Sequence, residues 1–153
     1  MPTSSPTPAD TQRIDLPVLC CVVIGGTLGT AIRYMFSSLP PFSWYFYTGT
    51  FLANMIACTA YSALASFLAG AWWIPARGKE LTNRTLGMGL CGGLSTLSAL
   101  AVEVLTTGRE GHLWSASIYL LLSFACGLVL AALGSHLGTR AAVGAGRGRK
   151  EAQ

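Results

Sequence analysis

The chain has 153 residues, of which 52% are hydrophobic and only 10% are charged, and its formal net charge is +4. Because a soluble domain carries about 25% charged residues, this composition and the mean hydropathy of +0.52 exclude an ordinary soluble protein and indicate an integral membrane protein. Much of the positive charge follows the last apolar stretch, where cytoplasmic flanks ordinarily carry Lys and Arg, so nucleic-acid binding is not expected.

The chain begins with a Pro-, Ser- and Thr-rich segment, residues 1–16, which is expected to be a disordered tail and not a cleaved signal peptide. Four apolar stretches follow, at about 17–38, 44–71, 85–106 and 113–138, and each is long enough to cross the hydrocarbon core, which takes roughly 20 residues. The Gly- and Ala-rich segment 139–153 is basic and is expected to be a second disordered tail that can lie against anionic headgroups. The sequence therefore predicts an all-α membrane protein with one four-helix domain, residues 17–138.

Lys and Arg are distributed unevenly over the two sides that four spans define. One side carries Arg109, and the other carries eight basic residues in the two tails and the loop between the second and third spans: Arg13, Arg77, Lys79, Arg84, Arg140, Arg147, Arg149 and Lys150. Because cytoplasmic loops carry the excess of Lys and Arg, both termini are expected to be cytoplasmic in a multi-pass plasma membrane protein.

Small residues recur at helical spacing in the first and last spans, as the pairs Gly25 and Gly29, and Gly134 and Gly138. Such pairs let two helix backbones approach closely in a membrane. The spacing alone leaves open whether they pack helices of one subunit or of two.

The third span is the most informative segment, because glycines, hydroxyls and one acid interrupt its apolar sequence GMGLCGGLSTLSALAVE, residues 87–103. Polar backbone and a carboxylate at membrane depth are costly and persist mainly where they line a water-filled path or an ion site. Polar residues also share a face on the second span, Thr50 and Asn54, and on the fourth, Tyr119 and Ser123. These polar residues either hydrogen-bond to one another within the subunit or face a path formed with another subunit.

The sequence shows no arrangement of residues that is typical of an enzyme active site. The five cysteines lie inside the predicted spans without a CxxC spacing, and the two histidines, His112 and His136, are not near another metal ligand. Neither a Ser/His/Asp nor a Cys/His arrangement is present. The chain is therefore expected not to be an enzyme.

Four pieces of the sequence carry a resemblance to a known family: GGTLGTAIRY (25–34), GTFLAN (49–54), GLCGGLSTLSALAVE (89–103), and Tyr119 with Ser123 in the fourth span. The first three are similar to the motifs GGxxGAxxRY, GTxxxN and GxxGGxTTFSTFSxE, and the last pair matches the fourth helix, of the small four-helix fluoride channels called Fluc or CrcB. The resemblance implies a dual-topology channel in which two antiparallel subunits form two narrow fluoride pores. It also implies a structural sodium ion that is not transported, held by the backbone carbonyls of Gly92 and Ser95 in an unwound segment GGLS (92–95).

The resemblance further assigns pore positions to individual residues. Asn54 would offer an amide donor to fluoride, Arg33 would attract anions near a vestibule, and Glu103 would be the acid of the third helix. The full predicted set is Arg33, Asn54, Thr96, Ser98, Glu103, Tyr119 and Ser123. The same side chains are also compatible with structural roles: an interhelical hydrogen bond for Asn54, a headgroup anchor for Arg33, a hydrogen-bonded structural acid for Glu103, and core packing for Tyr119 and Ser123.

The third span departs from the family pattern where TTFSTF is replaced by STLSAL. Leu97 and Leu100 stand in place of two phenylalanines whose ring edges would contact the anion, and Ala99 lacks a hydroxyl. Leucine has no quadrupole to present to an anion. This loss and the one-sided positive charge favour a heterodimer with a homologous subunit of opposite orientation, while a homodimer stays open.

The predicted function is therefore a fluoride-specific channel subunit that passively exports fluoride from the cytoplasm. One alternative is a degenerate subunit retained for assembly of its partner, which the two leucines favour. Another is a small proton-coupled drug exporter, which would need an acid in the first span, where the chain has Arg33 instead.

Overall fold

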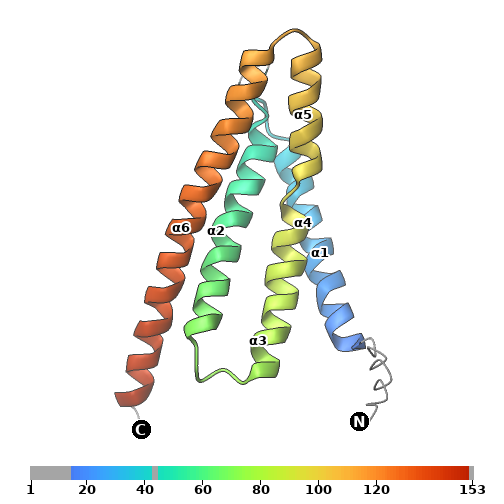
Figure 1. Cartoon of the computed structure of the whole chain (residues 1–153). Coiled ribbons are helices and arrows are strands. Elements are labelled where there is room, and N and C mark those ends of the chain that lie inside the picture. The colour runs from blue at the N-terminus through green and yellow to red at the C-terminus, as the bar shows by residue number, and fades with distance from the viewer. Residues whose placement is uncertain (1–14, 43–44, 152–153) are drawn as a thin grey trace, which may run out of the picture.

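The computed structural model describes residues 15–42 and 45–151 as a bundle of four membrane-length helical segments (Figure 1). The first is α1, Leu16–Ser37, and the second is α2, Thr48–Gly70. The third is composite: α3 (Ala76–Thr82), η1 (Asn83–Cys91), α4 (Gly92–Leu94) and α5 (Leu97–Arg109) follow one another in line. The fourth is α6, Leu113–Glu151. The prediction of an all-α protein with four spans and a break in the third is confirmed.

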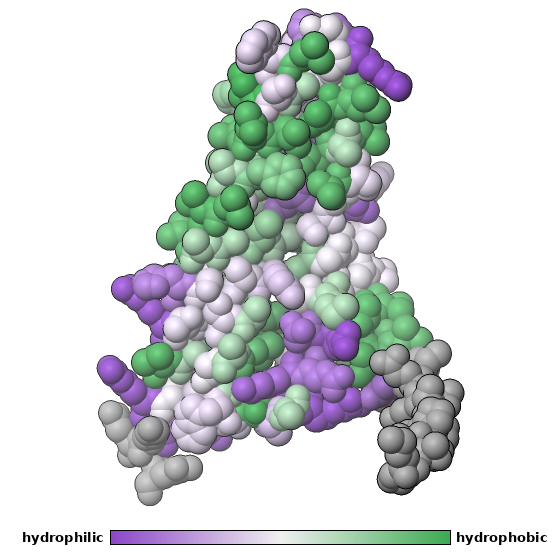
Figure 2. Space-filling view, in the orientation of Figure 1, coloured by the Kyte–Doolittle hydropathy of each residue, from purple (hydrophilic) through white to green (hydrophobic). Residues whose placement is uncertain are grey.

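The bundle exposes a largely apolar exterior, as the space-filling view shows over most of its upper body (Figure 2). Hydrophilic side chains gather toward the ends of the bundle in this view. Large side chains such as Val23, Leu121 and Leu128 are 57%, 68% and 72% exposed. Exposing an apolar exterior of this kind to water is unfavourable, whereas lipid tails solvate it.

Two glycine-lined contacts bring the helices together. A Cβ atom at Gly25 or Gly29 would collide with the backbone of η1 at Thr85 and Leu90, so α1 lies directly against η1. Gly134 and Gly138 likewise lie against the α2 carbonyls of Thr59 and Ala63. Both small-residue pairs therefore pack helices within the subunit, which decides the question that their spacing left open.

The segment after Thr139 is helical, so the prediction of a disordered C-terminal tail at 139–153 is wrong for the residues that the structure describes. α6 has 39 residues and is about 58 Å long, well beyond a hydrocarbon core of about 30 Å. Its end is supported by the loop after α2: Ala142 is 2% exposed, and Gly146 lies close to Trp72 and Trp73. One of the glycines that indicated disorder, Gly146, instead makes room for these rings. The predicted N-terminal tail falls almost entirely on residues 1–14, which lie outside the described residues.

The π-helical turn η1 was not predicted from the sequence. It spans nine residues, Asn83–Cys91, and its glycines Gly87 and Gly89 are buried. π-helical turns occur mostly as short insertions at functional sites, and this one leads directly into α4 and the break.

Candidate functional site: a polar break between two pockets

The break in the third span is held by the side chain of Asn54. The Thr96 backbone N–H donates to Asn54 Oδ1 at 2.7 Å, and Asn54 Nδ2 donates to the Thr96 carbonyl at 3.2 Å. Ser95 and Thr96 are both extended, with φ/ψ of −76°/150° and −151°/114°. An amide side chain from α2 thus replaces the helical partners of one peptide group at membrane depth. An amide nitrogen carries two N–H groups, so Asn54 keeps one further donor.

At the break, two backbone N–H groups that would donate to the Gly92 and Ser95 carbonyls in a continuous helix donate to side chains instead. In a continuous helix the Thr96 N–H would donate to the Gly92 carbonyl, and the Ala99 N–H to the Ser95 carbonyl. Here the Thr96 N–H binds Asn54, and the Ala99 N–H donates to Thr96 Oγ1 at 3.2 Å. Gly92 and Ser95 are the same two residues whose carbonyls the resemblance assigns to sodium. Carbonyl oxygens freed in this way are the donors that a hard cation prefers.

The conformation of Gly92 differs from the expectation of an unwound GGLS segment. Gly92 is helical, with φ −67° and ψ −36°, and the chain leaves the helix only at Ser95. The reason is that the bond from Asn54 reaches Thr96, so the α4 turn before it stays intact. A Cβ atom at Gly92 would meet nothing within 4 Å in the described chain, so this glycine faces outward from the subunit.

Glu103 is fixed by two hydroxyl groups from other helices. Thr50 Oγ1 on α2 donates to Glu103 Oε1, and the Tyr119 hydroxyl on α6 donates to Oε2 at 2.8 Å. Tyr119 is 2% exposed, and the Ser123 hydroxyl donates to its carbonyl at 2.7 Å. Each carboxylate oxygen therefore has a partner, and the network ties α5 to α2 and α6. Thr50 belongs to this network, whereas the sequence indicated only that it shares a helix face with Asn54.

A first pocket of about 320 Å³ opens beside this network. It contains three of the predicted pore residues, Arg33, Thr96 and Glu103, and it is lined by Thr30, Arg33, Tyr34, Ser37, Gly49, Thr50, Thr96, Ala99 and Glu103. The two ion pairs of the described chain are both made by Arg77, with Asp15 and Glu80, and none by Arg33. The guanidinium of Arg33 therefore keeps its charge available to an anion in the pocket.

A second pocket of about 310 Å³ lies on the other side of the break. Thr96 lines both pockets, so the peptide held by Asn54 stands between them. Its lining is mostly apolar and contains both substituted positions: Asn54, Met55, Cys58, Ser95, Thr96, Leu97, Leu100, Ser123, Phe124, Gly127, Leu128 and Ala131.

The predicted pore residues divide into three groups in this geometry. Asn54, Thr96 and Ser123 meet at the second pocket, and Arg33, Thr96 and Glu103 at the first. Tyr119 lines neither, and its hydroxyl donates to Glu103. Ser98 also lines neither, and its hydroxyl lies 3.1 Å from Thr96 Oγ1. Sequence reasoning missed Thr30 and Phe124, because a threonine or phenylalanine in an apolar span carries no signal of its own.

Comparison with known proteins covers the whole site. A family model described as CrcB-like protein, Camphor Resistance (CrcB), matches residues 20–135. The chain is 48% identical over 140 residues to a fluoride-specific ion channel FluC 2 of Bifidobacterium longum, which covers 92% of this chain and 78% of that protein. It is 34% identical over 125 residues to a FluC of Ignicoccus hospitalis, with 82% and 98% covered. It is 33% identical over 131 residues to a FluC of Pyrococcus furiosus, with 83% and 100% covered.

Proposed function

Because the chain belongs to the CrcB-like protein, Camphor Resistance (CrcB) family, as its motifs predicted, we propose that it is a subunit of a fluoride-specific ion channel. The channel lets fluoride leave the cytoplasm passively and so lowers its concentration in the cell. The observation that carries this proposal is the break at Thr96, where a side-chain amide from α2 stands between two pockets. The relatives named for fluoride channels support the choice of ion.

The residues around the break supply what a small, strongly hydrated anion needs. Arg33 has no carboxylate partner among the described residues and attracts anions into the first pocket by its charge. The spare N–H of Asn54 then replaces part of the hydration shell as the ion passes the break. The carboxylate of Glu103, with both oxygens bound by hydroxyls, is held in place by the bundle.

Passive export follows from the chemistry of the ion. Fluoride enters cells as the neutral acid HF and ionises at neutral pH. A membrane potential that is negative inside drives an anion outward at about 2.3 kcal/mol per 100 mV. An anion-selective path through a multi-pass protein of the plasma membrane is therefore sufficient, and no enzymatic energy source is required.

A structural sodium ion fits the carbonyl groups of the break. The Gly92 and Ser95 carbonyls have lost their helical partners, and oxygen donors of this kind suit a hard cation. Two carbonyls are too few for such an ion, so the site needs a second break beside the first. A bound sodium ion would hold the two breaks together, and the outward-facing Gly92 leaves room for that approach.

The second break is assigned to an antiparallel partner subunit. One side of this chain carries eight Lys and Arg residues and the other carries Arg109, a bias that favours one orientation with both termini cytoplasmic. A homologue inserted the other way round completes the dimer. Leu97 and Leu100, which line the second pocket, favour a second candidate: a subunit that mainly supports assembly of a partner with a working pore.

Growth in fluoride separates these possibilities. The chain and an oppositely biased homologue are expressed, each alone and both together, in a cell without its own fluoride exporter. Rescue only when both are present is the expected result. Full rescue by this chain alone would contradict the heterodimer and keep the channel, whereas full rescue by the homologue alone would contradict both the heterodimer and the assembly role.

A further inference from the structure

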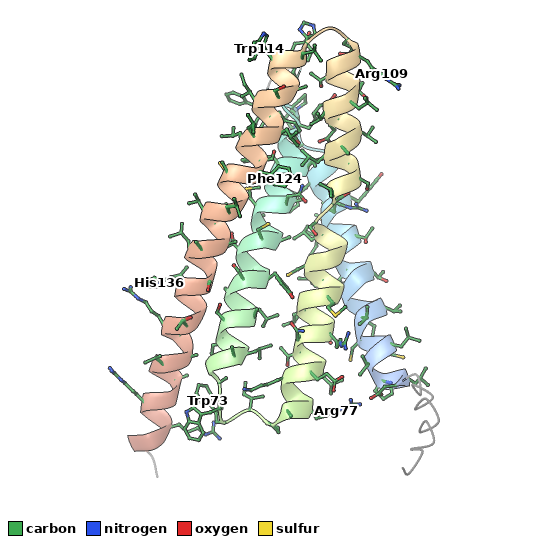
Figure 3. The ribbon with its side chains drawn as sticks, in the orientation of Figure 1. Trp73, Arg77, Arg109, Trp114, Phe124 and His136 are labelled. Atoms are coloured by element: carbon green, nitrogen blue, oxygen red, sulfur yellow. The ribbon has the colours of Figure 1, made fainter. Side chains whose placement is uncertain are left out.

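The second pocket contains one aromatic side chain, and it comes from α6. Among its described lining residues only Phe124 carries a ring, and Ser123, Leu97 and Leu100 line the same pocket. Figure 3 places Phe124 on α6 close to the height of the break between α4 and α5. We propose that Phe124 presents its ring edge to fluoride in this pocket, an inference that rests on the proposed function.

The ring makes no aromatic pair in the described part of the chain. Phe46 and Tyr119 pair edge to face at 5.2 Å, and other rings pair edge to face or tilted, but no ring contact of the described residues includes Phe124. Phe124 is 55% exposed. More than half of its surface is therefore open in the subunit, and no other ring of the described residues covers its edge.

The chemistry of the pocket gives the ring a specific role. An aromatic ring is negative on its faces and positive at its edge, so the edge attracts an anion and aliphatic side chains do not. The pocket also contains the spare N–H of Asn54, on the adjoining helix α2. An edge from α6 and an amide from α2 would approach the ion from different helices.

The same pocket explains how a ring on α6 can replace rings on α5. Leu97 is 69% exposed and Leu100 is 5% exposed, and both line the cavity that Phe124 lines. A phenylalanine at Leu97 would project toward the same space. Phe124 therefore acts as a specificity-determining residue, and its effect should be interchangeable with that of an aromatic residue at position 97.

The test measures fluoride and chloride efflux from liposomes that hold the native assembly of the full chain. Phe124→Leu should reduce fluoride efflux by about tenfold, the scale of an aromatic edge contact, and should reduce fluoride over chloride selectivity. Phe124→Tyr, which keeps the ring edge, should retain efflux. Adding Leu97→Phe to Phe124→Leu should restore it. The control is Phe51→Leu, the same change on α2 in a different pocket, which should leave efflux unchanged.

Three results would overturn the inference in distinguishable ways. Wild-type efflux and selectivity in Phe124→Leu would mean that the ring faces lipid or the partner. A loss in Phe124→Leu that neither Phe124→Tyr nor Leu97→Phe repairs would make it a packing residue. An unmodified assembly that releases no fluoride would contradict the proposed function itself and this inference with it.

Discussion

Replacing Asn54 tests the break most sharply, because this side chain has two separable tasks. It accepts from the Thr96 N–H at 2.7 Å and donates to the Thr96 carbonyl at 3.2 Å, and it keeps a spare donor for the ion. Asn54→Leu removes both tasks. Asn54→Asp keeps the acceptor for the Thr96 N–H and removes the donors, so the break is held but the anion is not.

The magnitudes follow from these bonds. Thr96 is 8% exposed, and a buried backbone N–H left without a partner costs about 1–3 kcal/mol, so Asn54→Leu should destabilise the assembly by about that amount. A hydrogen bond to a charged group is worth about 1.5–3 kcal/mol. Its loss should therefore lower fluoride efflux about tenfold to a hundredfold in both variants.

The assay is fluoride efflux from liposomes, with thermal unfolding of the assembly measured beside it. Ser62→Ala is the matched control on α2, because its hydroxyl makes only a local bond to the Thr59 carbonyl, and it should change neither quantity. Wild-type efflux in Asn54→Leu would refute the reasoning. Fluoride efflux at the original rate in Asn54→Asp would show that Asn54 only holds the break.

Three further predictions test other parts of the account. Gly25→Ala should destabilise the chain by about 1–3 kcal/mol in thermal unfolding because a methyl group collides with η1. At Gly144 a Cβ meets nothing within 4 Å, so Gly144→Ala should stabilise the chain by up to about 1 kcal/mol. Equal effects of the two substitutions would contradict the packing of α1 against η1. Ser95→Ala should preserve sodium-dependent dimer assembly because its carbonyl stays, and Gly92→Val should abolish it by crowding the partner; equal tolerance across a sodium titration would contradict the cation site. Arg33→Gln should slow fluoride efflux about threefold to tenfold, with the difference shrinking at high salt; an effect independent of salt would contradict electrostatic attraction.

The four spans could be predicted from the sequence because apolar length is a local property. The presence of the break was also visible, since glycines and hydroxyls interrupt the third span. Its position was not, because it is set by the bond between Asn54 and Thr96, which are 42 residues apart. Gly92 is helical for the same reason.

Tertiary contacts also determine two features that composition could not predict, the helical C-terminal segment and the position of Thr50. The Gly-rich end of the chain indicated disorder, yet Gly146 leaves the space in which Trp72 and Trp73 support α6. Thr50 completes the Glu103 network only because α2 and α5 lie close together at that height. Neither contact could be predicted from the type of side chain alone.

The measurement that tests the central claim most directly is anion release from liposomes containing the purified native assembly, followed with a fluoride-selective electrode. When a potassium ionophore removes the opposing potential, trapped fluoride should leave along its gradient while trapped chloride stays. Retention of fluoride by a folded assembly, or equal release of chloride, would contradict the assignment of this chain to a fluoride-specific channel.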